Sequence, residues 1–533
     1  MKVTFVAFGT EQLGISQLSA VLRRAGHSTS LAFNPALFAD RYYLDVPALG
    51  SRLDGTARAI ETAVAARPDL LAFSVLTPLY GWCLEVARAV KARLDVPVIF
   101  GGVHPSAVPE ICLDNDCVDY VCVGDGEDAI LRLCDALATG AGRPERPIPN
   151  LWWKDGDRLV RGEQAPFIQD LDSLPHYDKE LWADELRIGD NYLTMTARGC
   201  PYRCTFCFNN FYAKLASGKY VRQRSISHVM EELSHAKSTY DVKRVEFEDD
   251  IFTVDKVWLR AFLDEYKREI DRPFQCLVHP RYVDRDIARW LKDAGCQHVQ
   301  MGVQSADAEY KRKQLLRMER EVHLDDALDA LAEAGVGTKL DHILGLPGEP
   351  ESAQEKARAL YARFPPLRVQ TFWLTHLPAI ELTRNAVADG HLSEAEYAAI
   401  ERGETRRFRM APNDPRAAFY QRYELLFRLI PLLPKAMRDR LRVHHIPPLP
   451  KSVAELASLA LDVLNVLVRR DDEAINYLRH YVDQLGRVLL RKRKVPRTFG
   501  PTAQPPSRPT PTERAGVDTG RLFGIKKRAR IDA

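Results

Sequence analysis

The stretch Arg198-Gly199-Cys200-Pro201-Tyr202-Arg203-Cys204-Thr205-Phe206-Cys207 places three thiols within eight residues, spaced C-x3-C-x2-C. It follows directly after a strand-like run, Tyr192–Ala197. Thiolates on one loop can face a common centre, and soft sulfur ligands suit an iron–sulfur cluster or zinc. Structural zinc takes four protein ligands, and no second C-x2-C or H-x3-H pair is nearby. We therefore predict a [4Fe–4S] cluster on Cys200, Cys204 and Cys207, with one iron left open to bind a substrate.

The cluster loop begins a series of alternating strand and helix patterns that runs from residue 191 to about 395. The series has six strand-like segments, fewer than the eight units of a closed barrel. We therefore expect an open, partial (βα)6 barrel. Its expected strands are Tyr192–Ala197, Arg244–Glu248, Gln275–Val278, His298–Val303, Thr338–Leu344 and Val369–Thr375.

Residues 1–145 show a second alternation of short apolar runs and helical patterns. Strands that alternate with helices indicate a parallel sheet covered on both faces. We expect a doubly wound, Rossmann-like α/β domain that binds its ligand at the carboxyl ends of the strands. The expected strands are Lys2–Phe8, Leu70–Leu76, Val96–Phe100 and Asp119–Val123.

Three further segments complete the expected organisation. Residues 146–190 are rich in proline and predict a linker with a small hairpin at Trp152–Val160, where Asp155-Gly156 makes the turn. Residues 396–495 predict an α-helical region. Residues 496–533 have much proline and little apolar content, which predicts a disordered basic tail.

Composition excludes several classes of protein. The 533 residues include 75 Lys and Arg against 72 Asp and Glu, a balance that gives no reason to expect nucleic-acid binding. Ten cysteines are too few for a disulfide scaffold. The N-terminus lacks a signal-peptide pattern, and no run of about 18 apolar residues predicts a spanning helix. We expect a soluble, cytoplasmic protein.

The cysteine loop resembles the signature of the radical S-adenosylmethionine superfamily, C-x3-C-x-aromatic-C, with Phe206 at the aromatic position. The resemblance covers roughly residues 190–350. It implies that the open iron chelates S-adenosylmethionine and that one electron from the cluster cleaves the sulfonium to methionine and a 5′-deoxyadenosyl radical. It also implies a one-electron reductant, such as flavodoxin or ferredoxin, as a partner.

Two later stretches resemble further motifs of that superfamily. Acidic residues end the second barrel strand where the family contacts the methionine ammonium, and which of them does so stays open. The run His342–Glu349 resembles the fifth-strand motif along the adenine, with Asp341 in place of the first glycine and the glutamate one residue late. The implied S-adenosylmethionine contacts are Phe206, Glu248, Asp249, Asp250, Gln304, Ser305, Ile343 and Gly345.

The N-terminal strand ends resemble the cobalamin-binding domains of methionine synthase and the mutases. Ser74-Val75-Leu76 and Gly101-Gly102 match the S-x-L and G-G elements, although a glycine pair after a strand is also typical of a plain turn. In the D-x-H-x-x-G element, Glu11 replaces the histidine that is the lower cobalt ligand, which implies binding without a histidine nitrogen. The implied cobalamin contacts are Thr10, Glu11, Gly14, Ser74, Leu76, Gly101, Gly102, His104, Gly124 and Glu127.

Together the two domains resemble the cobalamin-dependent radical S-adenosylmethionine enzymes. This resemblance implies methylation of an unactivated carbon of a small-molecule or lipid substrate, with 5′-deoxyadenosine and S-adenosylhomocysteine as coproducts. Two alternatives stay open. One is a cyclisation or rearrangement without methyl transfer, which would form no S-adenosylhomocysteine. The other is a non-catalytic cobalamin or iron–sulfur sensor, which would form no 5′-deoxyadenosine.

A leucine-rich segment in the C-terminal region has two interpretations. Apolar and basic residues lie close together there, which is typical of a surface that rests on a membrane and admits a lipid such as a polycyclic isoprenoid. The other interpretation is packing over the open barrel. The residues concerned are Leu425, Leu426, Leu429, Ile430, Leu432 and Leu433 with Arg428, Lys435 and Arg438.

Overall fold

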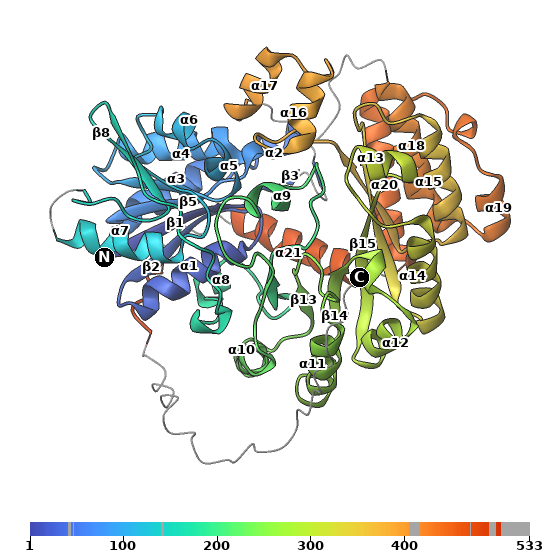
Figure 1. The fold of residues 1–533 in the computed structure, drawn as a ribbon, viewed down its shortest axis with the longest axis horizontal. Helices are drawn as coiled ribbons and strands as arrows, with labels where there is room; N and C mark the ends of the chain where they lie inside the picture. The colour runs from blue at the N-terminus through green and yellow to red at the C-terminus, as the bar shows by residue number, and fades with distance from the viewer. Residues whose placement is uncertain are drawn as a thin grey trace, which may run out of the picture. The chain divides into compact units, whose positions relative to one another are not determined.

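The structure is a computed structural model that describes residues 1–40, 44–45, 47–139, 143–404, 416–469, 471–489 and 497–502. Two mainly or wholly parallel sheets, each flanked by helices, make up its two α/β parts, and a helical region follows them (Figure 1). The expected α/β class with a helical C-terminal region is confirmed.

The N-terminal sheet has the order β2-β1-β5-β6-β7-β8-β9, and its first five strands are parallel. Successive side chains of a strand point to opposite faces, so β1 feeds two cores: Phe5 packs with helices α1 and α7, and Val6 packs with α3 and α4. Helices therefore cover both faces, as a doubly wound sheet requires. The bounds are β1 (Lys2–Phe8), β2 (Ser28–Asn34), β5 (Leu70–Ser74), β6 (Val98–Gly101), β7 (Tyr120–Cys122), α1 (Leu13–Arg24), α3 (Thr56–Ala66), α4 (Tyr80–Lys91) and α7 (Glu127–Ala138).

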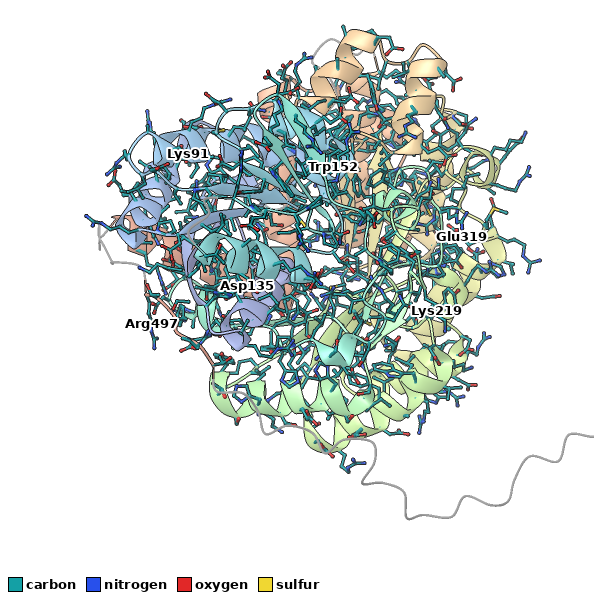
Figure 2. All side chains as sticks on the ribbon, turned by 60° about the vertical axis from the view of Figure 1, so that its left-hand side comes forward. Lys91, Asp135, Trp152, Lys219, Glu319 and Arg497 are labelled. Carbon is teal, nitrogen blue, oxygen red and sulfur yellow. The ribbon has the colours of Figure 1, made fainter. Side chains whose placement is uncertain are left out.

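The segment expected as a linker is packed against the N-terminal domain. Strands β8 (Leu151–Asp155) and β9 (Arg158–Arg161) form the expected hairpin, which adds to the sheet antiparallel to β7; Trp152 is labelled in Figure 2. Beyond it, helix α8 (Glu180–Ala183) carries the fully buried Trp182, whose indole N–H donates to the Ser16 hydroxyl at 2.8 Å. Burial of this side chain explains why the segment is ordered despite its prolines.

The second sheet is the expected six-stranded partial barrel, in the order β10-β13-β14-β15-β16-β17 with every pair parallel. Val245 and Phe247 of β13 are buried toward the helices, whereas Glu246 lies half-buried on the opposite, inner face. The strands are β10 (Tyr192–Thr194), β13 (Val245–Phe247), β14 (Phe274–Val278), β15 (Cys296–Gln304), β16 (Gly337–Leu344) and β17 (Arg368–Trp373). The main helices are α10 (Ile226–Tyr240), α11 (Lys256–Glu269), α12 (Arg285–Asp293), α13 (Ala308–Lys313), α14 (Glu321–Ala334) and α15 (Ser352–Arg363).

The C-terminal helices agree with the second interpretation of the leucine-rich segment, packing. Leu426 of α18 and Ile430 directly after it are fully buried in contact with α15 and α20, and Arg428 pairs with Glu424 at 2.6 Å and with Asp462 at 3.1 Å. These apolar residues therefore form core, whereas Lys435 beyond them is exposed. The helices are α16 (Glu381–Ala388), α17 (Glu394–Glu401), α18 (Ala417–Leu429), α19 (Lys435–Arg440), α20 (Lys451–Arg469) and α21 (Asp472–Leu489). No helix in the described part of the chain is both long and apolar enough to cross a membrane.

The start of the expected tail also differs from the expectation. Phe499 is buried and pairs with Thr29 of the edge strand β2, with N–H to carbonyl distances of 2.8 and 2.9 Å. Arg23 lies over its ring. The unpaired edge of a sheet favours the addition of a strand. The buried side chain of Phe499 anchors the start of the proline-rich segment at this edge. Residues 503–533 lie outside the described part.

Candidate functional site

The three-cysteine loop leaves the barrel through the short strand β11 (Ala197–Arg198) and returns through β12 (Arg222–Gln223), with helix α9 (Phe208–Tyr212) between them. Cys204 is buried and the other two cysteines are half-buried. Burial raises the pKa of Cys200 to about 12 and that of Cys204 to about 11. Without a bound cation these groups are therefore thiols at neutral pH.

The donor set fits a cluster better than a single metal ion. The three sulfurs are close enough for Cys204 and Cys207 to add to the raised pKa of Cys200. Yet among the described residues no three His, Cys, Asp or Glu side chains converge on one ion position. In a four-iron cluster each thiolate binds its own iron, so the ligands stand apart, and three of them leave one iron open.

A buried arginine side chain lies behind the cysteine loop. Gln314 and Leu315 accept hydrogen bonds from Thr205, at 2.7 Å from its hydroxyl and 3.1 Å from its N–H, which brings residues 314–319 against the cysteines. Arg317 in this segment donates to the Gly302 carbonyl at 2.8 Å and to Glu319 at 2.7 Å (Glu319 is labelled in Figure 2). Its charge opposes the effect of burial on the pKa of Cys204. The site therefore holds a fixed positive charge beside the predicted cluster.

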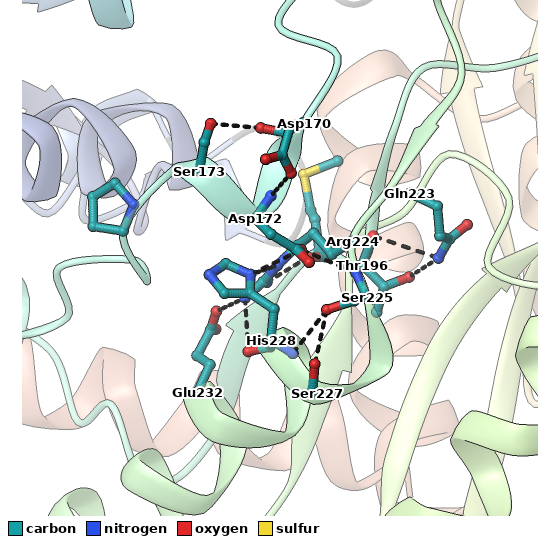
Figure 3. Close-up of polar contacts among 12 residues, drawn as sticks. Asp170, Asp172, Ser173, Thr196, Gln223, Arg224, Ser225, Ser227, His228 and Glu232 are labelled. Atoms are coloured by element: carbon teal, nitrogen blue, oxygen red, sulfur yellow. Dashed lines mark hydrogen bonds and ion pairs between the residues drawn. The ribbon is translucent and has the colours of Figure 1, made fainter. Parts of the chain in front are cut away.

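A second buried arginine fastens the return of the loop. Arg224 donates to Glu232 at 2.6 Å and to His228 at 3.0 Å, and its backbone N–H donates to the Thr196 carbonyl at 2.8 Å (Figure 3). Gln223 reaches Thr196 as well. The network ties α10 to the strand that precedes the cysteines, so the two ends of the loop are held together.

The acidic run after β13 divides into different roles. Asp249 is buried and accepts from the N–H and the hydroxyl of Thr196, at 3.0 and 2.6 Å, and burial raises its pKa to about 6. Asp250 accepts from Asn209 at 2.7 Å and from the backbone N–H of Gly199. Both carboxylates thus brace the cysteine loop. Glu248, half-buried, follows Glu246 by two residues at the end of the inner face.

The remaining candidates for S-adenosylmethionine contacts lie at the carboxyl ends of β15 and β16. Phe206 and Ile343 belong to one apolar cluster under the cysteine loop. Gln304 and Gly345 have left-handed backbone, with φ of +65° and +82°. Ser305 is fully buried, and its hydroxyl forms a hydrogen bond with the Glu349 carboxylate.

The corresponding edge of the N-terminal sheet is an apolar, glycine-rich surface. Leu76 is 41% exposed, Ser74 is half-buried, and Gly101 is half-buried beside them. Gly102 has φ of +98°, and a Cβ there would lie 3.0 Å from the backbone nitrogen of Val75. Glycine is therefore required for the close approach of the two strand ends, and the exposed Leu76 beside the half-buried Gly101 leaves these strand ends accessible to a large planar cofactor.

His104 does not reach this surface. Its ring is fully buried against Tyr80, Nδ1 lies 3.1 Å from the Thr77 hydroxyl, and burial lowers its pKa to about 3. Nε2 has no hydrogen-bond partner among the described residues. We interpret His104 as a neutral residue that supports the turn after β5 and not as a group at the cofactor edge.

The loop after β1 and the start of α1 contain two exposed residues and one buried carboxylate. Thr10 and Gly14 are exposed, and a Cβ on Gly14 would meet no atom within 4 Å. Glu11 is buried instead, and its carboxylate lies 2.6 Å from Nζ of Lys179 and accepts from Ser16 at 3.0 Å. The burial of Glu11 excludes a solvated carboxylate at this position.

The glycine-rich edge and the cysteine loop are joined by a set of contacts. Arg198, two residues before Cys200, pairs with Glu127 at 2.7 Å, and Arg222 pairs with Asp125 at 3.0 Å. The Tyr212 hydroxyl lies 3.2 Å from that of Ser106. Gly124, with φ of +88°, has Gln164 and Leu215 so close that a Cβ would crowd them. Gly124 and Glu127 therefore join the two sites through protein contacts.

Family models match both parts of the chain. The model of the radical SAM superfamily matches residues 194–360, and the model of the B12 binding domain matches residues 3–133. The chain is a radical SAM protein with an N-terminal B12 binding domain. The radical SAM domain implies a [4Fe–4S] cluster and S-adenosylmethionine, and the B12 binding domain implies cobalamin.

Individual proteins are similar to the chain. One similar structure is that of TsrM from Kitasatospora setae, a radical S-adenosylmethionine methyltransferase solved with cobalamin and a [4Fe–4S] cluster. It matches 73% of this chain and 75% of TsrM, with a TM-score of 0.58 and 17% identity. An uncharacterized methyltransferase of Pyrococcus horikoshii is 28% identical over 57% of this chain and 66% of its own length. The anaerobic magnesium-protoporphyrin IX monomethyl ester cyclase of Cereibacter sphaeroides is 23% identical over 54% and 48%. The chain thus spans less than two thirds of these two sequence relatives.

Two residues of the radical SAM protein's site carry no signal in a short motif. Lys179 stands between Asp178 and Glu180 and reads as a surface lysine, and Arg317 lies in a run of basic residues. Both are buried in the structure. A weak signal exists for Arg317, because an acidic residue, Glu319, stands two positions after it within that basic run.

Proposed function

We propose that this radical SAM protein methylates an unactivated carbon of a small-molecule or lipid substrate, with S-adenosylmethionine as both radical source and methyl donor. The observation that carries the proposal is the direct link between the cysteine loop and the glycine-rich edge, through Arg198–Glu127 and Arg222–Asp125. A substrate radical and a methyl donor must share one cavity, and these ion pairs keep the two sites together.

The chain's own residues would serve three tasks in this reaction. Cys200, Cys204 and Cys207 would hold the cluster, and Glu248 would accept from the methionine ammonium, since a carboxylate is the fitting partner for that group. The surface of Leu76, Gly101 and Gly102 would hold cobalamin, which supplies a transferable methyl group when bound.

The inner face of the barrel favours a substrate that carries hydrogen-bond donors. Asp341, which stands where the family motif has glycine, accepts from the side chain of Gln300 at 3.0 Å. Glu246 accepts from Asn191 on the same face. Both carboxylates are half-buried and so accessible from the inner side of the sheet. A hydroxyl or amine group of the substrate would be recognised there.

Product analysis tests the proposal. The reconstituted protein, a one-electron reductant and S-adenosylmethionine with a labelled methyl group are incubated anaerobically with extracts of polar metabolites and of lipids. We expect 5′-deoxyadenosine, S-adenosylhomocysteine and a labelled product in comparable amounts. Formation of 5′-deoxyadenosine and product without S-adenosylhomocysteine would favour the cyclisation or rearrangement alternative, which the similarity to the Cereibacter cyclase supports. Absence of 5′-deoxyadenosine would favour a sensor.

A further inference from the structure

Helix α20 (Lys451–Arg469) turns its apolar side to solvent. Among residues 453–469, the part of the helix whose side chains the structure describes, seven are exposed and all seven are apolar; Leu456 and Leu467 are both 64% exposed. At about 100° per residue they fall within one arc of about 140°. We call this arc the α20 outer face: Val453, Leu456, Ala460, Val463, Leu464, Leu467 and Val468.

The opposite side of the helix packs on the protein and mixes apolar with polar residues. Ala454 and Val466 are buried there. Asn465 is buried as well, and its amide donates to the Arg428 carbonyl at 2.8 Å. Asp462 accepts from the Arg428 guanidinium at 3.1 Å, and Glu424 completes that group's pairing at 2.6 Å. The usual surface helix buries its apolar face and exposes a polar one, whereas the exposed side of α20 is apolar too.

These polar contacts fix the rotation of the helix. Turning α20 to bury its leucines would leave the Arg428 guanidinium, which lies between α18 and α20, without Asp462. Buried charges that lose their partner are strongly unfavourable. The apolar arc therefore stays outward, and an exposed apolar patch of this kind marks an interaction surface.

The exposed charges of α19 favour an anionic partner. They are Lys435, Asp439 and Arg440, two basic residues against one acidic residue, and the apolar Met437 among them is exposed as well. A two-fold dimer through this region would bring two positive surfaces together, so like charges disfavour a second copy as the partner.

We propose that the α20 outer face rests on an anionic phospholipid surface, with its leucines and valines among the acyl chains and the basic residues of α19 near the head groups. Apolar insertion and basic charge are the two contributions that hold a helix in the plane of a membrane interface. This contact goes beyond the proposed reaction and does not depend on it. It does supply a route by which a substrate dissolved in the membrane reaches the protein.

Vesicle binding tests the surface in the full chain. Sedimentation is measured with vesicles of phosphatidylglycerol and phosphatidylcholine and with vesicles of phosphatidylcholine alone. We expect at least tenfold tighter binding to the anionic vesicles, and salt should weaken it. The variant Leu456→Ser with Leu467→Ser should lose at least tenfold, and so should Lys435→Glu with Arg440→Glu. The matched control is Val257→Ser, because Val257 is an 83% exposed apolar residue on α11; it should bind as the parent does.

Several outcomes would overturn the proposal. One is that the folded full chain, with its cluster bound, binds neither kind of vesicle. Another is equal loss in the Val257→Ser control. A third is a dimer in sedimentation velocity that the double serine variant converts to monomer with vesicle binding unchanged, which would assign the face to a second copy.

Discussion

The Glu11 carboxylate lies 2.6 Å from Nζ of Lys179, and both side chains are almost fully buried. Glu11 follows the first strand of the B12 binding domain, and Lys179 comes from the segment that leads to the barrel, where it also donates to the Leu193 carbonyl of β10. This pair therefore joins three parts of the chain. It occupies the position at which the D-x-H-x-x-G motif has its histidine.

The first prediction concerns the stability of that pair. Lys179→Met should leave the Glu11 carboxylate buried without a cation, and breaking a buried pair in this way costs about 3–5 kcal/mol. We expect a melting temperature several degrees lower in calorimetry of the full chain. The double variant Glu11→Gln with Lys179→Met should recover part of the loss, because it leaves no unpaired charge. Equal melting of the parent and the Lys179→Met variant would contradict the buried pair.

The second prediction concerns the cysteines. Replacing Cys200, Cys204 and Cys207 by Ala should abolish the brown absorbance and the bound iron, because iron–sulfur clusters are held by thiolates. Iron and sulfide are assayed after anaerobic reconstitution. Cys83 is a buried cysteine of the N-terminal core, so Cys83→Ala serves as the control and should keep its iron. Four irons per chain in the triple variant would disprove the assignment.

The third prediction separates the acidic residues after β13. Glu248→Gln should weaken S-adenosylmethionine binding by roughly 10- to 150-fold, the equivalent of one charge-assisted hydrogen bond, with iron content unchanged. Asp249→Asn should instead lower stability and cluster occupancy, since both of its oxygens accept from Thr196 and an amide nitrogen cannot. Binding is measured by calorimetry and iron by assay. If Glu248→Gln bound S-adenosylmethionine with unchanged affinity, another group would be the partner of the methionine ammonium.

The fourth prediction concerns Arg317. The reduced cluster carries one more negative charge than the oxidised one, so a nearby fixed cation favours reduction. At an effective dielectric constant of about 20, a charge about 10 Å away contributes about 1.7 kcal/mol, or roughly 18-fold in an equilibrium constant. Arg317→Met should therefore lower the ratio of reduced to oxidised clusters at a given potential by roughly 18-fold, equivalent to about 74 mV. Arg317→Lys keeps the charge and should stay near the parent in a redox titration followed by electron paramagnetic resonance. If the parent and both variants had the same reduction potential, Arg317 would have no role in setting the potential of the cluster.

The sequence predicts those features of this protein that depend on neighbours along the chain. The cysteine spacing, the six barrel strands and the Asp155-Gly156 hairpin are local patterns, and the structure has the strands and the hairpin. The partners of Glu11 and Arg428 could not be predicted, because Lys179 and Asp462 stand 168 and 34 residues away. For the same reason the sequence leaves two interpretations open for the leucines of α18. The helix that covers them is α20, and part of its own apolar residues are exposed.

The last prediction places cobalamin. Because Glu11 is held by Lys179, we expect the bound cobalt(II) form to show no nitrogen superhyperfine splitting in electron paramagnetic resonance. Gly102 is a poor position for a steric test, because its positive φ and the nearby Val75 would strain any side chain. Gly14 is better: it lies in α1 with no atom within 4 Å of an added Cβ. Gly14→Trp should therefore fold and lose at least tenfold in cobalamin affinity by steric overlap. Gly486 in α21 has the same open surroundings, so Gly486→Trp is the matched control and should keep full affinity. Full cobalamin binding by a folded Gly14→Trp variant would move the cofactor away from this loop, and splitting from an axial nitrogen would mean that a histidine or the cofactor's own base binds the cobalt.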